Sequence, residues 1–189
     1  MRPILAFLFL SSLLVAQADT KSLVVVPDDR SDVKWVRAQR IPERYAPRKW
    51  QESTNGIACA LTASKDTVAV GEAIMLQVFF KNTSNHPFRF IEGMKVRGEI
   101  YFPLTIQGPA GKLQFKGKDT GLYGLTMTTL KAGEVLRFQC RVNPATWGIS
   151  QVGRYSISLE FPFHDVPGED DVPGWEGTIR FNALEVTVR

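Results

Sequence analysis

The sequence predicts an all-β sandwich of about eight or nine strands, preceded by an export signal and a basic arm. Three observations support it: an apolar N-terminal run, a period of two in apolar residues from residue 57 onward, and turn residues between the alternating runs. A period of two places one face of each strand on a core and the other in water. Short strands separated by regularly spaced turns are typical of a sandwich or a barrel.

The first 18 residues contain the parts of a secretory signal peptide. Arg2 supplies the positive start, residues 4–15 are almost entirely apolar, and Ala16-Gln17-Ala18 has the small-x-small pattern that signal peptidase reads. The apolar run is shorter than the roughly 20 residues that a membrane-spanning helix needs. We therefore expect cleavage between Ala18 and Asp19, no stable membrane insertion afterwards, and a secreted or periplasmic mature chain.

Residues 19–52 are expected to form a basic arm outside the domain. Leu23–Val26 is consistent with one strand, and Val33–Arg40 is predicted to be a short helix with Asp32 as its N-cap. Basic and aromatic side chains are interleaved here: Trp35, Arg37, Arg40, Arg44, Tyr45, Arg48, Lys49 and Trp50. This composition indicates either an arm that holds an anionic partner or a tail that packs over the sandwich. The second is favoured, because aromatic side chains are usually buried.

The domain is expected to span residues 53–189. Regular alternation predicts strands at 57–62, 74–81, 136–142, 155–160 and 179–188, the last with a bulge at Asn182-Ala183. Less regular strands are expected at 88–91, 100–106, 113–115 and 122–128, where Pro103 indicates a sheet edge or a bend. Turn residues separate these runs at 70–72, 82–85, 108–111, 131–134 and 151–154.

Short motifs resemble those of bacterial immunoglobulin-like domains. Val70-Gly71-Glu72 before an alternating strand is similar to their opening, and Lys131–Glu134 is similar to a later turn. Gly153-Arg154-Tyr155 resembles the start of the strand whose tyrosine makes the tyrosine corner. The resemblance implies one antiparallel immunoglobulin-like sandwich over residues 57–189. It does not extend to the antibody type, because no tryptophan lies between the two cysteines and Ile157 stands where the second cysteine is expected. A fold likeness of this kind assigns no function by itself.

Cys59 and Cys140 both lie on the apolar phase of predicted strands. Export would bring them into an oxidising compartment, where a disulfide between them is favoured. Such a bridge would close a long loop and stabilise the fold by up to ~4 to 5 kcal/mol on the chain-entropy account. The alternative is a pair of separate buried thiols that pack as small apolar groups.

The loop between the last two predicted strands, residues 163–177, is rich in carboxylates and prolines. Four of its residues are candidate calcium ligands, because Ca²⁺ binds six to eight oxygens: Asp165, Glu169, Asp170 and Asp171. The alternative is that these charges are simply solvated. Trp175, with His164 nearby, is the candidate partner-binding anchor, because large aromatic residues on rigid loops often carry binding energy. The alternative for Trp175 is to cap the open end of the core.

The sequence carries no recognisable catalytic motif, and no cofactor is expected apart from calcium. The net charge of +4 is too small to favour a nucleic-acid partner. The leading expectation is an exported, non-enzymatic binding or structural module of the cell envelope or exterior, which contacts a protein or glycan through its end loops. The alternatives are a calcium-dependent carbohydrate-binding module, a protease inhibitor that presents Val166–Trp175, and, least favoured, a glycosidase with paired carboxylates. Asn82-Thr83-Ser84 also fits the acceptor pattern for N-glycosylation.

Overall fold

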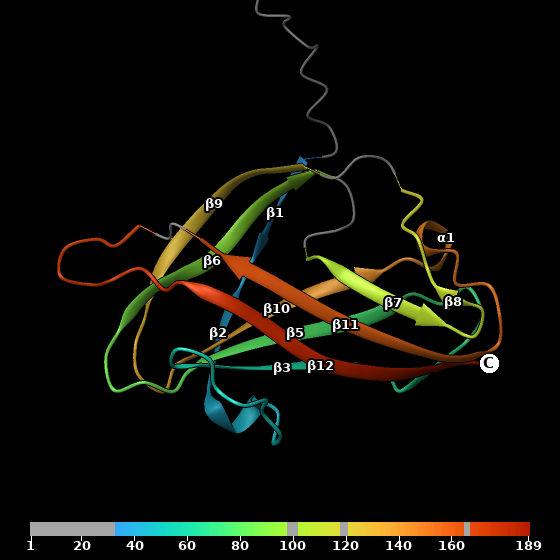
Figure 1. The fold of residues 1–189 in the computed structure, drawn as a ribbon, viewed down its shortest axis with the longest axis horizontal. Coiled ribbons are helices and arrows are strands. Elements are labelled where there is room, and N and C mark those ends of the chain that lie inside the picture. The colour runs from blue at the N-terminus through green and yellow to red at the C-terminus, as the bar shows by residue number, and fades with distance from the viewer. Residues whose placement is uncertain (1–32, 98–101, 118–120, 165–166) are drawn as a thin grey trace, which may run out of the picture. The chain divides into compact units, whose positions relative to one another are not determined.

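Strands in three sheets make up the fold, which is all-β apart from two short helical turns (Figure 1). The computed structural model describes residues 33–97, 102–117, 121–164 and 167–189, and all of them belong to a compact unit that begins at Ser31. The predicted signal peptide and the predicted strand at Leu23–Val26 lie outside the described residues. No helix in the described ranges is both long and apolar enough to cross a membrane.

Two sheets face each other and enclose the main core. The first, here the β5 sheet, has the order β2 (Gln39–Ile41), β10 (Val135–Val142), β5 (Ile74–Asn82) and β3 (Ile57–Ala63). The second, here the β11 sheet, has the order β4 (Thr67–Val68), β12 (Gly177–Val188), β11 (Gly153–Phe163), β7 (Leu104–Gly108) and β8 (Gly111–Lys112). Phe80 of the β5 sheet packs edge-on against Phe181 and Phe163 of the β11 sheet, with ring centroids 5.6 and 6.3 Å apart.

A third sheet, the β6 sheet, has the order β1 (Val33–Arg37), β6 (Phe88–Arg97) and β9 (Gly121–Leu130). It joins the same core through Phe90, whose ring lies 5.1 Å from that of Phe80 and 4.9 Å from that of Phe163. The helical turns are a 3-10 turn at Glu43–Tyr45 and α1 (Pro144–Trp147), and Trp147 is buried against Phe115.

Most of the regular strand predictions are confirmed, and so is the bulge. Ile157 lies opposite Leu184, but Leu159 lies opposite Phe181, so β12 carries one extra residue at Asn182-Ala183. The tyrosine contact that the resemblance implies is also present, because the Tyr155 hydroxyl donates to the Gln151 carbonyl at 2.9 Å. Residues 113–115 form no strand, although Leu113 and Phe115 pack against the core.

The helix predicted at Val33–Arg40 is wrong. This segment forms β1, which pairs with β6, and β2, which pairs with β10, with a break at Ala38. Long-range strand pairing decides the structure here, and the local helical pattern does not.

The expected domain start at residue 53 is corrected as well, because residues 39–50 cover the outer face of the β5 sheet. Ile41, Ala46 and Trp50 pack there on a small apolar cluster that contains Phe79 and Val135. This packing is the second of the two alternatives for the arm.

Asn82 ties the β5–β6 connection to the β9–β10 turn, where the chain crosses between the β5 sheet and the β6 sheet. Its side chain is fully buried and donates to the carbonyls of His86 and Leu130, each at 2.9 Å. Its amide oxygen accepts from the backbone N–H and the hydroxyl of Ser84 at 2.8 and 2.7 Å. Its backbone bonds both Glu134 and Gly133 of the β9–β10 turn. Every polar group of this buried side chain therefore has a partner, as burial requires.

We expect Asn82→Ala to lower the free energy of unfolding by about 2 to 3 kcal/mol, because it leaves buried carbonyls without their donor. Urea denaturation would measure the loss. Asn85→Ala is the matched control, since Asn85 is exposed and contacts only the neighbouring His86 ring, and it should change stability by less than about 0.5 kcal/mol. Equal effects of the two substitutions would show that the Asn82 amide does not hold this junction.

Candidate binding surface

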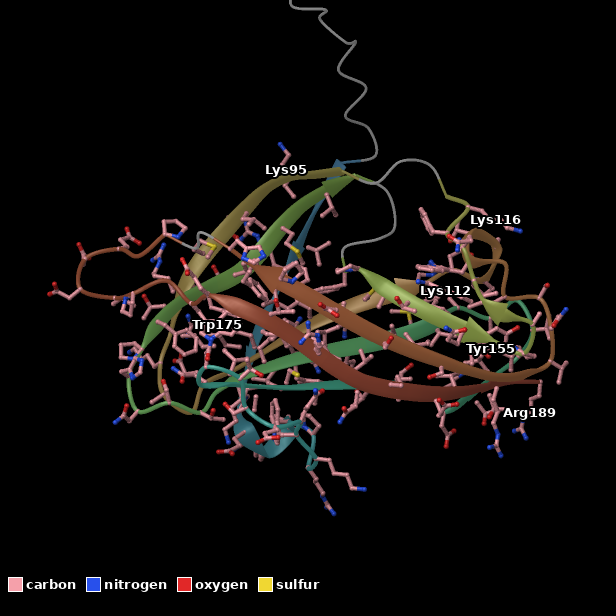
Figure 2. The ribbon with its side chains drawn as sticks, viewed as in Figure 1. Lys95, Lys112, Lys116, Tyr155, Trp175 and Arg189 are labelled. Carbon is pink, nitrogen blue, oxygen red and sulfur yellow. The ribbon has the colours of Figure 1, made fainter. Side chains whose placement is uncertain are left out.

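Trp175 is not the exposed anchor that the sequence predicted. Its side chain is only 3% exposed, and its ring packs edge-on against Phe90 and Phe163, with centroids 5.8 and 5.3 Å away. The indole N–H donates to the Asn55 carbonyl at 2.8 Å. Figure 2 shows Trp175 beside the first residues of β12, where it closes the end of the core. The apolar bulk of the indole and its satisfied N–H make burial the stable arrangement.

The loop that carries Trp175 is fixed to β6 at its base. The Arg89 N–H donates to the Pro173 carbonyl at 2.7 Å, and the Trp175 N–H donates to the Arg89 carbonyl at 3.0 Å. The Arg89 guanidinium also pairs with the Glu169 carboxylate. At the tip, Glu169 and Val172 exchange two backbone hydrogen bonds across a tight turn in which Asp170 has a φ of +51°. The described tip is thus a closed turn and not an extended strand.

The expected calcium ligands do not come together in the described part of the loop. Glu169 is engaged by Arg89, and Asp170 and Asp171 are exposed at the turn. Asp165 lies outside the described residues, and His164 is exposed beside that gap. Within the described ranges, no group of three or more His, Cys, Asp or Glu residues is placed to hold a metal ion.

The expected disulfide is wrong, because the two cysteines lie on opposite sides of β5. Cys59 on β3 is opposite Phe80, whereas Cys140 on β10 is opposite Leu76. Two strand spacings separate β3 from β10 by roughly 10 Å, and the offset along β5 adds to this. Disulfide-bonded residues have Cα atoms only about 4.4–6.8 Å apart. Both thiols are buried and unbridged, which is the alternative that the sequence left open.

The glycosylation pattern at Asn82 is also not usable in the folded domain. A glycan would be attached to the amide nitrogen, and this nitrogen is buried and donates two hydrogen bonds. His86, the other histidine, is exposed.

A group of exposed basic and aromatic side chains lies on residues 44–50, here called the basic-aromatic segment. Tyr45 is 63% exposed, and the Arg44 guanidinium lies over its ring at 4.9 Å. Arg48 and Lys49 are exposed, and Trp50 is half-buried with the Lys81 ammonium 6.0 Å from its ring centroid. Lys81 also pairs with Glu43 at 2.5 Å. The segment thus presents cations and aromatic rings from a backbone that packs on the sandwich.

Gln51 fixes the end of this segment to the open side of the sandwich. Its backbone N–H donates to the Cys59 carbonyl of β3 at 2.9 Å, and its side-chain oxygen accepts from the Asn182 N–H of β12 at 2.7 Å. The bulge at Asn182-Ala183 removes this N–H from the regular ladder, so the Gln51 side chain satisfies it. One side chain therefore bridges both sheets.

Two adjoining hollows follow β12 beside Gln51, and together they are called here the β12 cleft. The first has a volume of about 170 Å³ and is lined by Lys49, Trp50, Gln51, Cys59, Ala60, Leu61, Asn182, Ala183 and Leu184. The second has a volume of about 270 Å³ and is lined by Gln51, Glu52, Ser53, Thr54, Thr178 and Arg180. Both are smaller than the roughly 300–1,000 Å³ typical of pockets that enclose a small molecule.

Amides, hydroxyls and charged side chains line most of the cleft. Its lining contains no histidine, and burial raises the pKa of the Cys59 thiol from 9.0 to about 12. A thiol with so high a pKa is protonated at neutral pH and is a poor nucleophile. The amides, hydroxyls and charged groups that remain are suited to hydrogen bonding and ion pairing.

Comparisons with known proteins add little to this geometry. No family model and no curated protein matches the chain. Among solved structures it is similar to a β-glucosidase from Erythrobacter marinus, at 14% identity and a TM-score of 0.38 over 70% of this chain and 15% of that one. It is also similar to a β-glucosidase from Listeria innocua, at 13% identity and a TM-score of 0.34 over 69% of this chain and 16% of that one.

A third likeness is to AvmM, which catalyses macrocyclization in alchivemycin A biosynthesis. The identity is 15% and the TM-score is 0.35, over 74% of this chain and 94% of that one. This chain spans less than a fifth of the length of the two β-glucosidases. At these identities and TM-scores, neither a fold family nor an activity carries over from any of the three proteins.

Sequence reasoning missed Gln51 and Arg180, which lie at the centre of the cleft. The predicted bulge at Asn182-Ala183 and the basic-aromatic pattern that includes Lys49 and Trp50 were the signals in the sequence that pointed to this place. A bulge leaves backbone groups unpaired, and such groups need a partner from elsewhere in the chain.

We expect Trp175→Ala to destabilise the domain by about 3 to 5 kcal/mol, because it leaves a cavity at the end of the core. Chemical denaturation would measure this loss, and Asp171→Ala, an exposed change in the same loop, should have little effect. A Trp175→Ala domain with unchanged stability would contradict the capping role.

We expect the two thiols to react with a thiol reagent only after unfolding. The pKa of the Cys59 thiol is 9.0 without the fold, and burial raises it to about 12 in the folded domain. Between these values the unfolded state binds fewer protons, so Cys59 makes stability fall as pH rises from about 9 towards 12. The free energy of unfolding of the wild type and of Cys59→Ala, measured between pH 9 and pH 12, would test this pH dependence. The wild type should lose stability faster, and parallel curves would contradict the high pKa.

Proposed function

We propose that this protein is an exported, non-enzymatic binding module built on an immunoglobulin-like sandwich. The proposed contact surface is the basic-aromatic segment together with the β12 cleft, and the proposed partner is an anionic protein or glycan. The end loop that the sequence favoured is replaced by this surface, because Trp175 is buried and the base of its loop is paired with β6.

Strand order supports the immunoglobulin-like part of the proposal. In that fold, strands A, B, E and D form one sheet and C, F and G form the other. Assigning β3, β5 and β10 to A, B and E leaves β2 in the position of D. β7, β11 and β12 then correspond to C, F and G, and Tyr155 lies near the start of the F-like strand, as a tyrosine corner requires. The β6 sheet is the addition to this plan.

The observation that carries the binding proposal is the fixed presentation of unpaired cations beside aromatic rings. Among the described residues, no carboxylate lies within ion-pairing distance of Arg44, Arg48 or Lys49. β2 pairing before the segment and the Gln51 bonds after it hold the backbone in place. A surface that is already ordered loses less conformational entropy when a partner binds.

The signal-peptide pattern of the first 18 residues supports export. A basic surface outside the cytoplasm would meet acidic polymers of the envelope or of the surroundings. Cation–π contacts of the kind seen between Arg44 and Tyr45 orient a guanidinium without neutralising it, so its charge remains available to a partner.

We expect the mature chain to bind poly-L-glutamate or polygalacturonate, and charge reversal in the basic-aromatic segment to weaken that binding by at least ~10-fold. This estimate takes about 0.5–1 kcal/mol for each of the three exposed ion pairs lost. The test variant combines Arg44→Glu, Arg48→Glu and Lys49→Glu, and affinity is measured by calorimetry against both polymers.

A control variant combines Lys131→Glu, Arg141→Glu and Arg154→Glu, which change the net charge equally at exposed positions on other parts of the domain. The control should keep most of the affinity. Equal losses in the two variants would indicate a non-specific charge effect and would overturn the proposed surface. A preference for one polymer separates an acidic polypeptide from an acidic glycan.

A further inference from the structure

The outer edge of β12, the edge away from β11, is only partly occupied along the cleft. Two hydrogen bonds fix which residues face outward: the Asn182 N–H donates to Gln51, and the Arg180 carbonyl accepts from the Cys59 thiol at 3.6 Å. The backbone N–H and carbonyl of one residue point to the same side of a strand, and successive residues point to alternate sides. The Arg180 N–H and both backbone groups of Thr178 therefore point outward too. Within the described ranges, none of these has a hydrogen-bond partner.

β4 covers this edge only at its far end. It pairs with Thr187 and Val188, so within the described ranges no strand of the β11 sheet pairs with the outer side of Thr178–Asn182. The same three outward residues line the cleft: Thr178 and Arg180 the larger hollow, and Asn182 the smaller one. The Gln51 side chain and the Cys59 thiol reach Asn182 and the Arg180 carbonyl, and the larger hollow lies beside the remaining groups, those of Thr178 and the Arg180 N–H.

The cleft has the dimensions of a strand site and not of an enclosed ligand pocket. The outward residues repeat about every 6.6 Å, the spacing at which an added strand makes its bonds. The five-residue stretch is close to the usual length of a strand in globular proteins. Two shallow hollows, centred on residues 178–180 and on 182–184, can receive alternate side chains of such a strand.

Charge indicates the kind of strand. The Arg180 guanidinium pairs with Glu160 of β11 at 3.2 Å, and Glu52 is the carboxylate in the lining of the cleft. The positive charge that faces the cleft therefore comes from Lys49, with Arg44 and Arg48 in the adjoining basic-aromatic segment. Opposite charges on neighbouring strands stabilise a pair, and like charges destabilise it. An acidic segment fits this lining better than a basic one or than a second copy of β12, which would place Arg180 close to its own counterpart.

We propose that an extended acidic peptide adds to the outer edge of β12 between Thr178 and Asn182 as an extra strand of the β11 sheet. This inference rests on the proposed function and specifies its partner. Main-chain hydrogen bonds to Thr178 and to the Arg180 N–H give the affinity. Acidic side chains directed toward Lys49 and the basic-aromatic segment give the preference, with side-chain pockets acting as in other complexes formed by strand addition.

The decisive variant is Arg180→Pro, compared with Arg180→Ala. Both remove the guanidinium, but only proline removes the outward N–H. Proline is tolerated at an edge position whose N–H does not serve the ladder, so pairing with β11 should survive. A thermal melt of each variant confirms that it is folded before binding is compared.

The probe is a synthetic peptide of alternating glutamate and valine, with fluorescence polarisation as the readout. Its control has the same side chains and an N-methyl group on every second amide, which blocks strand pairing. We expect Arg180→Ala to bind the probe, Arg180→Pro to bind at least ~10-fold more weakly, and the N-methylated peptide to bind neither. We also expect the probe to slow hydrogen exchange at the Arg180 amide of the wild type.

Equal binding by the two Arg180 variants, equal binding of both peptides, or no binding of the probe to the wild type would overturn the strand-addition proposal. The hydrogen-exchange measurement gives an independent answer if Arg180→Pro does not fold. Loss of polymer binding in the Arg44, Arg48 and Lys49 variant, together with normal binding in Arg180→Pro, would leave the proposed function standing and remove only this inference.

Discussion

The rest of the fold depends on the hydrogen bonds of the buried Asn82 amide. Among the described residues it is the only fully buried polar side chain, and it lies where β5, β6, β9 and the β10 turn meet. An uncompensated amide in this place would cost several kcal/mol, so the four groups that bond it have to be in position together. This requirement specifies how the β6 sheet leaves the β5 sheet. It thereby also sets the positions of β1, which pairs with β6, and of β2, which pairs with β10.

Strands β3 and β5 bury consecutive side chains on both of their faces, which a period of two does not predict. Residues 39–50, which pack on the outer face of the β5 sheet, explain this burial. β5 buries Phe79 and Phe80 on opposite faces, and β3 buries both Cys59 and Ala60. One face meets the β11 sheet, and the other meets Ile41, Ala46 and Trp50. A sheet covered on both faces has near-continuous apolar strands. The run Val78-Phe79-Phe80 is therefore evidence of a covering layer, and residues 39–50 supply it.

Local signals predicted local structure well, and long-range partners were beyond them. The bulge at Asn182-Ala183, the turns and the contact of Tyr155 with Gln151 depend on residues close in sequence, and all were readable. The helix at Val33–Arg40 failed because its real partners, β6 and β10, lie more than 50 residues away. The disulfide prediction was wrong because the alternation of apolar residues assigns a cysteine to one face of a strand. It does not show which strand lies between that cysteine and another. Trp175 was ambiguous for the same reason, since only the fold brings Phe90 and Asn55 to it.

The candidate surface follows from one imperfection in an otherwise regular ladder. Without the bulge, β12 would run straight and its N–H groups would alternate regularly between β11 and the outside. The extra residue turns the Asn182 N–H toward Gln51, which draws the end of the basic-aromatic segment onto the sandwich edge. The segment then forms one wall of the cleft, while β12 forms the other with its backbone still open at Thr178 and Arg180. Bulges and charged side chains are common means of protecting an edge from indiscriminate pairing. Here the bulge and Arg180 limit the open stretch to a few residues, which leaves little edge for indiscriminate pairing and is the length that the proposed strand addition needs.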